Sequence, residues 1–209
     1  MKIKEKNFIS VVVYVHNAEK RIESFLKMII RTLEENFEHS EIICVNDYCD
    51  DNSVEIIKKV NKIVASTNIT ILSMSYFHGL ETAMTAGNDL AIGDFVLEFD
   101  STLQDFAPEE IMKIYHKMLE GFDIVSASPD KKQRLSSRIF YHVFDQFSSI
   151  NYKINTERFR ILSRRAINRI NSINKSIPYR KAVYANCGLK NINIHYTPPQ
   201  SATSSLIRP

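Results

Sequence analysis

Five short apolar runs, rich in β-branched residues, predict five strands that are covered on both faces. They lie at residues 8–15, 41–45, 69–74, 95–99 and 122–127. Between them, over residues 22–37, 56–64, 80–91 and 111–119, apolar residues recur every three or four positions, which is typical of amphipathic helices. Strands that alternate with helices predict βαβ units, and therefore an α/β fold with a mainly parallel sheet and helices on both faces.

The pattern changes after residue 129, where we expect a basic helical C-terminal extension. Residues 133–148 have an apolar helical face that contains three phenylalanines. Such a basic, phenylalanine-rich helix could pack on the sheet or lie on an anionic membrane surface, and both interpretations stay open. A further helix is expected around residues 163–173. Residues 197–209 contain three Pro and three Ser and are expected to form a tail.

Composition agrees with a globular protein of one domain. The 209 residues are 44% hydrophobic and 24% charged. The longest apolar runs have about five residues, against roughly 20 for a membrane-spanning helix. The N-terminus has no apolar stretch typical of a signal peptide. The three Cys form no CxxC pair, so we expect reduced thiols and a cytoplasmic location, at the inner face of the membrane if the basic helix binds there.

Charge divides the chain into two parts. Residues 1–129 contain 12 Lys and Arg against 21 Asp and Glu, whereas residues 130–209 contain 15 against 3. The acidic part could hold a cation, and the basic part could meet a phosphate or an anionic surface, although a solvated basic surface would look the same. We therefore expect one domain over 1–196, with a ligand-binding half at 1–129 and a second half at 130–196.

Candidate chemistry gathers where the predicted strands end, which is where open α/β sheets bind ligands. Three strand ends carry polar residues: His16, Asn17 and Glu19; Asn46, Asp47, Asp50 and Asp51; and Asp100, Ser101, Thr102, Gln104 and Asp105. Carboxylates from several strands can hold a hard cation and, through it, a diphosphate. No G-x-G-x-x-G, P-loop, H-E-x-x-H or G-x-S-x-G pattern occurs at a suitable place, which argues against dinucleotide, P-loop, zinc hydrolase and serine hydrolase sites.

Four segments resemble motifs of family 2 glycosyltransferases with the GT-A fold. SVVVYVHNAEK (10–20) is similar to S-V-V-I-P-V-Y-N-A-E-K, and IICVNDYCDDNS (42–53) is similar to I-I-I-V-N-D-G-S-T-D-N-S. GLETAMTAGNDLAIGD (79–94) resembles G-x-x-x-A-x-N-x-G-x-x-x-A-x-G-D, and FDSTLQD (99–105) resembles the metal-binding D-A-D-L-Q-D. The order and spacing hold across about 100 residues, as expected of one family rather than of four chance matches.

The resemblance implies an inverting transferase that uses a nucleotide-sugar, with UDP-sugars favoured, in cell-surface glycan synthesis. It implies that Asp100 and Thr102 hold Mg²⁺ or Mn²⁺ on the diphosphate, and that Asp47 recognises the base. The other substrate-binding residues that it implies near the donor are Val13, Tyr14, Val15, Glu19, Gly79, Ser101 and Gln104. Asp100 and Arg160 are the catalytic candidates.

A fainter likeness points to the polyprenyl-phosphate branch, which resembles dolichyl-phosphate mannose synthase. Residues 134–141 and FRILSRR (159–165) are similar to R-x-x-S-x-x-F-Y and D-F-R-L-L-S-R-R. Many members of that branch have two membrane helices after this point, and none is visible here. Arg160, Arg164 and Arg165 are candidate contacts for an acceptor phosphate, which needs cations rather than a general base. A glycan hydroxyl stays open as the other acceptor, but it would need a carboxylate base, and the basic part is poor in carboxylates.

The sequence departs from the motifs at four places. Tyr14 stands at the usual Pro, residues 48–50 (Tyr-Cys-Asp) at a Gly-Ser-Thr, Thr102 at the second Asp of the metal motif, and Arg158 at the Asp before Phe-Arg. A hydroxyl is a weaker ligand than a carboxylate for a hard cation. An active transferase is the main hypothesis, and a relative that binds nucleotide-sugars without turnover is the alternative. A nucleic-acid binder is disfavoured because no known module is present.

Overall fold

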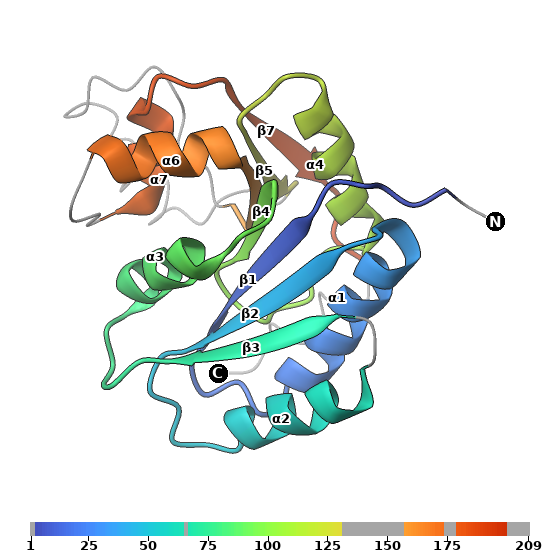
Figure 1. Ribbon diagram of the computed structural model, residues 1–209, viewed down its shortest axis with the longest axis vertical. Coiled ribbons are helices and arrows are strands. Elements are labelled where there is room, and N and C mark those ends of the chain that lie inside the picture. Colours follow the sequence, from blue (N-terminus) through green and yellow to red (C-terminus); the bar gives the residue numbers. More distant parts are fainter. Residues whose placement is uncertain (1–2, 65–66, 131–156, 174–178, 200–209) are drawn as a thin grey trace.

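The computed structural model describes residues 3–64, 67–130, 157–173 and 179–199 as a seven-stranded sheet between two layers of helices (Figure 1). The strand order across the sheet is β3-β2-β1-β4-β6-β5-β7. The strands are β1 (Ile9–Val15), β2 (Ser40–Asn46), β3 (Asn68–Ser73), β4 (Phe95–Phe99), β5 (Ile124–Pro129), β6 (Phe159–Ser163) and β7 (Asn191–Tyr196).

The strand β1 lies at the centre of the parallel part of the sheet. It pairs with β2 and β4, and β2 pairs with β3, all in parallel. The exception is β6, which runs antiparallel between β4 and β5, while β7 adds a parallel strand outside β5. The carboxyl ends of β1, β2 and β4 therefore meet at one edge of the sheet, and β6 begins at this edge.

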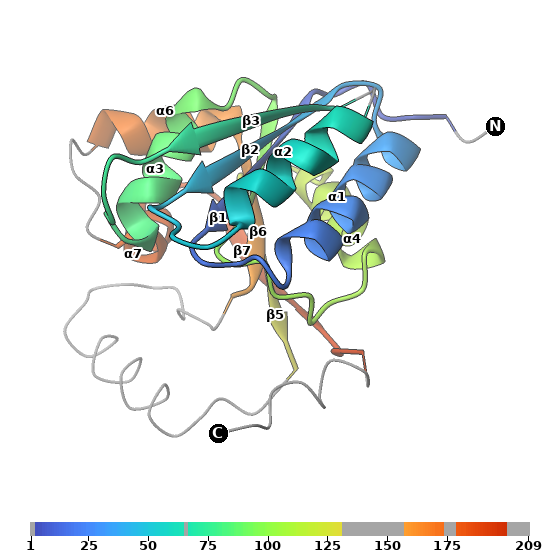
Figure 2. The same ribbon diagram turned by 90° about the horizontal axis from the view of Figure 1, so that it is seen from below.

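Helices cover both faces of the sheet, as the two perpendicular views show (Figures 1 and 2). The helices α1, α2 and α4 lie on one face, and α3, α6 and α7 lie on the other. They are α1 (Ile22–Asn36), α2 (Ser53–Ile63), α3 (Leu80–Leu90), α4 (Glu109–Leu119), α6 (Arg164–Ile173) and α7 (Arg180–Asn186). No helix within the described residues is both long and apolar enough to cross a membrane.

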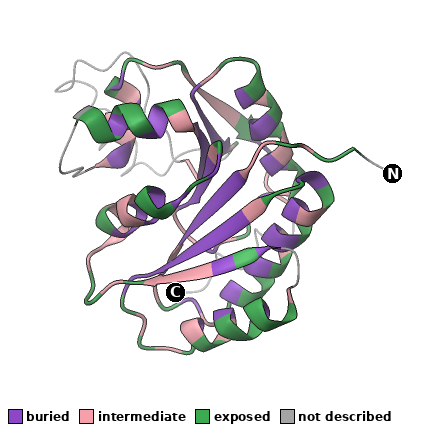
Figure 3. Cartoon of the chain, in the orientation of Figure 1, coloured by how far each residue is buried: buried purple, intermediate pink, exposed green. Residues whose placement is uncertain are grey.

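The two faces of the sheet receive alternate strand residues, and Figure 3 shows that buried residues run along the central strands. Val11 and Val13 of β1 pack with α1, α2 and α4, whereas Val12 packs against α3 on the other face. Because both faces are covered, β1 is almost continuously buried. This is why its sequence is an unbroken apolar run and not an alternating one.

The five predicted strands and four predicted helices of residues 8–127 are confirmed, as is the helix expected around 163–173. The expectation for the C-terminal part needs one correction, because it is not simply a helical extension. β6 and β7 enter the sheet and pair with β4 and β5. The predicted helix 133–148 lies outside the described residues. The division into halves at 129 and a tail from 197 stays a prediction.

Candidate functional site

The motif residues of three separate segments meet at the carboxyl edge of the sheet. Asn46, the last residue of β2, is level with Val15 at the end of β1, and Phe99, the last residue of β4, is level with Val13. The residues that follow, Asp47 and Asp100, therefore leave the sheet at neighbouring points of one edge. This arrangement was the main structural expectation from the sequence.

Asp47 is fully buried and joins β1, β2 and the start of α3. Its Oδ1 accepts the His78 N–H at 2.8 Å, and its Oδ2 accepts the Gly79 N–H at 2.9 Å. Oδ2 also accepts the hydroxyl of Tyr14 at 2.9 Å. Gly79 precedes α3 with φ +82°, a conformation that favours glycine. Asp47 thus fixes the loop that enters α3, and in this arrangement its carboxylate is enclosed by protein donors.

A second set of hydrogen bonds ties the loop after β1 to the loop after β2. The Glu19 N–H donates to Asp51 Oδ2 at 2.9 Å, and Glu19 Oε2 accepts the backbone N–H of Asn52 at 3.2 Å. The Ala18 N–H donates to the Ser53 hydroxyl at 2.8 Å. Glu19 therefore lies at the predicted edge and braces the two loops against each other.

Aromatic side chains surround this end of the sheet. Tyr48, Tyr76 and Phe77 are all more than half exposed. Tyr76 stacks on His78 with ring centroids 3.8 Å apart, and Phe77 lies 4.8 Å from the ring of His16. Flat, exposed rings beside polar backbone suit the stacking of a planar ligand.

At the same edge of the sheet, two guanidinium groups bridge Glu98 of β4 and Asp100, which directly follows β4. Glu98 and Asp100 are two positions apart and so point to the same face of the sheet. Arg160 of β6 lies opposite Glu98 and contacts Glu98 Oε2 at 2.6 Å and Asp100 Oδ2 at 2.7 Å. Arg180 of α7 contacts the same two carboxylates, with 2.9 Å to Glu98 Oε2 and 2.8 Å to Asp100 Oδ1.

Each guanidinium also has a carboxylate that it does not share. Nε of Arg160 contacts Glu157 at 3.1 Å, and Nε of Arg180 contacts Glu81 of α3 at 2.8 Å. Both arginine side chains are almost completely buried, whereas Asp100 keeps 15% of its side chain exposed. We call these six residues, Glu81, Glu98, Asp100, Glu157, Arg160 and Arg180, the bridged cluster.

The arginines of the bridged cluster lower the pKa values of the carboxylates that they contact. Burial alone would raise the pKa of Asp100, but Arg160 and Arg180 hold that pKa well below its usual range. The pKa of Glu98 is also lowered, against the effect of burial, by Arg180 and Arg160. Lys181, next to Arg180, is half-buried, and burial and the nearby Arg160 lower the pKa of its ammonium group.

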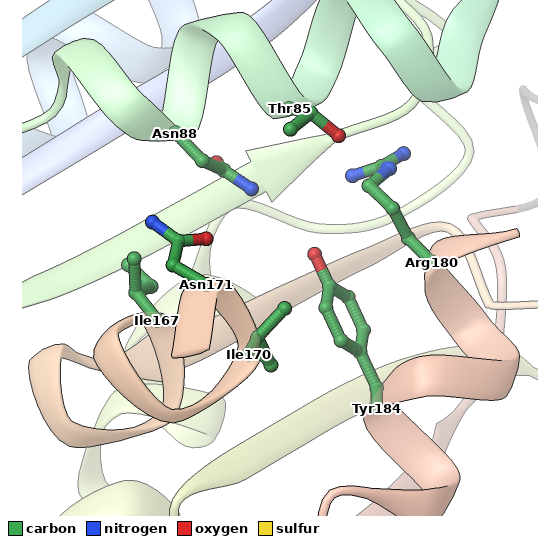
Figure 4. Close-up of a pocket in the computed structure, with 7 residues that line it drawn as sticks. All are labelled: Thr85, Asn88, Ile167, Ile170, Asn171, Arg180 and Tyr184. Atoms are coloured by element: carbon green, nitrogen blue, oxygen red, sulfur yellow. The ribbon is translucent and has the colours of Figure 1, made fainter. Parts of the chain in front are cut away.

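A pocket borders the bridged cluster between α3, α6 and α7 (Figure 4). Tyr184 of α7 points into it and donates its hydroxyl to Glu98 Oε1 at 2.6 Å. Asn88 of α3 donates its side-chain amide to the same oxygen, and its own Oδ1 has no hydrogen-bond partner among the described residues. The other lining residues are Thr85, Ile167, Ile170, Asn171 and Arg180.

The predicted cation ligands do not fit a divalent cation well. Hard cations prefer several oxygen ligands, with carboxylates foremost. Asp100 already receives three guanidinium hydrogen bonds, and Thr102 is buried with only 2% exposure. No group of three or more His, Cys, Asp or Glu in the described part of the chain could hold a metal ion. The role of Asp100 and Thr102 as metal ligands stays a prediction.

The other predicted residues divide into those at this edge and those away from it. Ser101 is half-buried and Gln104 is exposed just after Asp100, whereas Val13 and Val15 face the core and can offer a ligand only backbone atoms. Arg160 is fully buried and pairs with Asp100, and its role as a catalytic residue or phosphate contact stays a prediction.

Arg164 and Arg165 lie at the opposite edge of the sheet, because β6 runs antiparallel to β4 and ends there. Arg164 donates to the carbonyl of Gly93 at 3.0 Å, and Arg165 pairs with Asp123 at 2.6 Å. Their role as contacts for an acceptor phosphate stays a prediction.

A comparison with known families establishes the family of this chain. The family described as Glycosyl transferase family 2 matches residues 10–186, far more than half of the chain. The chain belongs to glycosyl transferase family 2. All four motifs lie within the matched residues.

Several proteins are similar to this family 2 chain. An uncharacterized glycosyltransferase of Synechocystis is 29% identical over 87% of the chain and 58% of its own length. A prophage bactoprenol glucosyl transferase homolog of Escherichia coli is 29% identical over 90% of the chain and 62% of its own length. The chain thus spans about three fifths of the length of these relatives.

A solved structure supports the fold. The mannosyltransferase PcManGT of Pyrobaculum calidifontis, in complex with GDP-Man and Mn²⁺, superposes with a TM-score of 0.69 at 17% identity. The match covers 94% of this chain and 56% of the other. At this identity the likeness establishes the GT-A fold only.

Sequence reasoning missed four residues of the site. Glu98 had a clear signal, because a carboxylate inside an apolar strand needs a cationic partner. Arg180 and Tyr184 had none, since α7 is only seven residues long and shows no clear period. Lys181 shares this helix and was missed for the same reason.

Proposed function

We propose that this chain transfers a sugar from a nucleotide-sugar, with UDP-sugars favoured, to polyprenyl phosphate at the inner face of a membrane, in cell-surface glycan synthesis. The observation that carries the proposal is the meeting of Asp47, Gly79 and Asp100 at one edge of the sheet, within the segment that matches family 2. The exposed rings of Tyr76 and Phe77 beside this edge suit a nucleobase.

The proposed reaction is a single displacement with inversion. The acceptor oxygen attacks the anomeric carbon while the bond from that carbon to the diphosphate oxygen breaks, and the nucleoside diphosphate leaves with the bonding electrons. A phosphate acceptor is already an anion and needs no base, whereas a sugar hydroxyl must lose a proton. This displacement uses no bound cation, because Asp100 is already paired with two arginines.

The carboxylates near the edge favour the phosphate acceptor. Glu157 has only 7% of its side chain exposed and is paired with Arg160, so it is poorly placed to act as a base. Arg158 stands where the family motif has Asp, and it pairs with the buried Asp105 at 2.9 Å while 30% of its side chain stays exposed. Arg158 directly precedes β6, which begins at this edge, and the half-buried Lys181 of α7 lies near Asp100 and Glu157, so these two are the cations that we assign to an acceptor phosphate.

The relatives agree with this choice. The Escherichia coli relative carries bactoprenol in its name, and a Proteus mirabilis relative, 31% identical over 61% of the chain, is named an undecaprenyl-phosphate transferase. The second candidate function is binding of a nucleotide-sugar without turnover. It is favoured by the replacement of the motif Asp by Arg158.

The test is transfer of labelled sugar by the full chain. Labelled UDP-sugars and GDP-mannose would be offered with polyprenyl phosphate in detergent or with a glycan, and label would be counted in the lipid extract. We expect label in the lipid extract. Arg158→Gln should lower the rate of label transfer at least about tenfold, which corresponds to the loss of one charge-assisted contact. Arg31→Gln, exposed on α1, is the matched control. Binding of a nucleotide-sugar without any labelled product would favour the second candidate.

A further inference from the structure

We infer that Arg160 and Arg180 take the place of a divalent cation as the counter-charges of Asp100, so that nucleotide binding at this edge needs neither Mg²⁺ nor Mn²⁺. The inference rests on the proposed function for the identity of the ligand. It differs from what the motif resemblance implies, where Asp100 and Thr102 hold the cation. Arg180 becomes a positioning residue that acts on the site through Asp100.

The geometry of the bridged cluster leaves little of Asp100 for a cation. Oδ1 accepts Nη2 of Arg180 at 2.8 Å and Nη1 of Arg160 at 3.3 Å, and Oδ2 accepts Nη2 of Arg160 at 2.7 Å. Arg160 approaches both oxygens, as in the two-point contacts typical of Arg and carboxylates. A cation on the remaining lone pair would lie beside two fixed guanidinium charges and would be repelled by both.

Releasing Asp100 would disturb the rest of the cluster. Both guanidinium groups also neutralise Glu98, which is completely buried. Moving either arginine towards solvent would leave this buried carboxylate short of a partner, which is strongly unfavourable. The arginines are therefore fixed parts of the site and do not give way to a metal ion.

The second predicted metal ligand, Thr102, is also unsuitable for binding a divalent cation. Thr102 replaces the second motif carboxylate, and it is 2% exposed. Among the described residues, cations close to Asp100 that could meet a ligand include Arg158, which is partly exposed, and Lys181, which forms no ion pair with a described residue. A diphosphate can meet these side chains directly, with no metal ion between.

The position of Arg180 in the fold supports its role as a positioning residue for Asp100. Arg180 comes from α7, a different element from the strand β6 that carries Arg160, and it also pairs with Glu81 of α3. One side chain thus connects α3, β4 and α7, and its Nη2 donates to Oδ1 of Asp100, the oxygen that Nη1 of Arg160 also approaches. Two independent elements supply equivalent charges to the same carboxylate.

Two measurements on the full chain test this inference. The first is titration of the protein alone with Mn²⁺, followed by electron paramagnetic resonance of the free ion, on wild type, Asp100→Asn and the control Asp89→Asn, whose carboxylate is exposed on α3. The second is calorimetry of UDP, GDP, CDP and dTDP binding to the same three proteins, once in EDTA and once in Mn²⁺.

We expect no saturable Mn²⁺ site that depends on Asp100, and one nucleotide whose affinity changes less than about twofold between EDTA and Mn²⁺. A Mn²⁺ site that is lost in Asp100→Asn but kept in Asp89→Asn would overturn the inference. So would a nucleotide affinity that is about tenfold higher in Mn²⁺ and loses this gain in Asp100→Asn. If no nucleotide binds in either condition, the proposed function fails, and the Mn²⁺ titration alone decides the role of Asp100.

A fourth protein, Arg180→Gln, tests the positioning role of Arg180. In Arg180→Gln one counter-charge is removed, so we expect an Asp100-dependent Mn²⁺ site to appear that wild type lacks. A merely structural role of Arg180 would lower stability without creating that site, and this result would overturn the assignment. If Arg180→Gln does not fold, as judged by circular dichroism, Arg180→Lys and the comparison of wild type with Asp100→Asn decide the question.

Discussion

The hydroxyl of Tyr14 donates a hydrogen bond to Oδ2 of Asp47 across 2.9 Å. Tyr14 stands where the family motif usually has Pro, so this donor is a feature of the present chain. Burial raises the pKa of Tyr14, and the hydrogen bond to Asp47 raises it further, so the phenol remains a neutral donor well above neutral pH. Two backbone N–H groups complete the surroundings of the buried carboxylate.

Tyr14→Phe should lower stability, because it removes one of three donors from a buried carboxylate. Hydrogen bonds to charged groups contribute about 1.5–3 kcal/mol, so we expect a loss of that size in the free energy of unfolding. Urea denaturation at pH 7, followed by circular dichroism, would measure it.

The control for this change is Tyr48→Phe, at the same edge of the sheet. Tyr48 is 57% exposed, so removal of its hydroxyl should change the free energy of unfolding by less than about 0.5 kcal/mol. Equal effects of the two substitutions would show that the contact between Tyr14 and Asp47 adds no stability.

The parallel part of the fold could be predicted from the sequence because its signals are local. The apolar run that became β1 and the helical period of α1 can each be seen in one stretch of residues. The strands β6 and β7 could not be predicted in the same way. β6 is only five residues long and contains Arg160, whose burial makes sense only beside Glu98.

The residues of the candidate site could also be predicted from the sequence only in part. Asp47, Gly79 and Asp100 could be predicted because motif spacing and strand ends place them together. The partners of Asp100 could not, since Arg160 and Arg180 lie 60 and 80 positions further along the chain. Arg164 is a phosphate candidate because of the FRILSRR motif, but the antiparallel strand β6 carries it to the opposite edge of the sheet.

The bridged cluster should make stability depend on pH in acid. The folded-state pKa values of Asp100 and Glu98 are lowered, so their contribution is present above the usual carboxyl pKa of about 4 and is lost as pH falls further. Urea denaturation of wild type at pH 7, 5, 4 and 3 should show a free energy of unfolding that declines below about pH 4.

Asp100→Asn should weaken this dependence and lower stability at neutral pH. Removing one partner of a buried ion pair costs about 3–5 kcal/mol, and the remaining exposure of Asp100 puts the expected loss at about 3 kcal/mol at pH 7. The variant should therefore approach wild-type stability as pH falls. Asp89→Asn should follow the wild-type curve throughout, and an unchanged curve for Asp100→Asn would contradict the role given to its two ion pairs.

Cys49 should be the first of the three cysteines to react with an alkylating reagent. It is half-buried, and its Sγ accepts the N–H of Asn17 at 3.3 Å, whereas Cys44 and Cys187 are buried. Burial raises the pKa of Cys44 to about 12, which leaves almost no thiolate at pH 8. Peptide mass spectrometry after iodoacetamide treatment would give the three rates.

The same experiment reports on the nucleotide site. Cys49 lies in the loop after β2, so a bound nucleotide should slow its alkylation and leave the slow reaction of Cys187 unchanged. Labelling of Cys187 as fast as Cys49 would contradict the burial of α7 against the sheet. Equal slowing of both cysteines would indicate a general stabilisation of the fold rather than cover over the loop.

Gly87 should not tolerate a side chain, although it lies within α3. A Cβ at this position would lie 2.5 Å from Cγ1 of Val12 and 2.6 Å from Cγ2 of Val45, and both methyl groups are fixed in the core. Alanine is favoured over glycine in a helix by about 1 kcal/mol, but overpacking of a core costs about 1–3 kcal/mol, so the clash should outweigh the helix preference.

We expect Gly87→Ala to lower the melting temperature, measured by calorimetry. Thr82→Ala, on the exposed side of the same helix, should leave that temperature unchanged or raise it slightly. A higher melting temperature for Gly87→Ala would mean that α3 can move away from β1 and β2 at little cost.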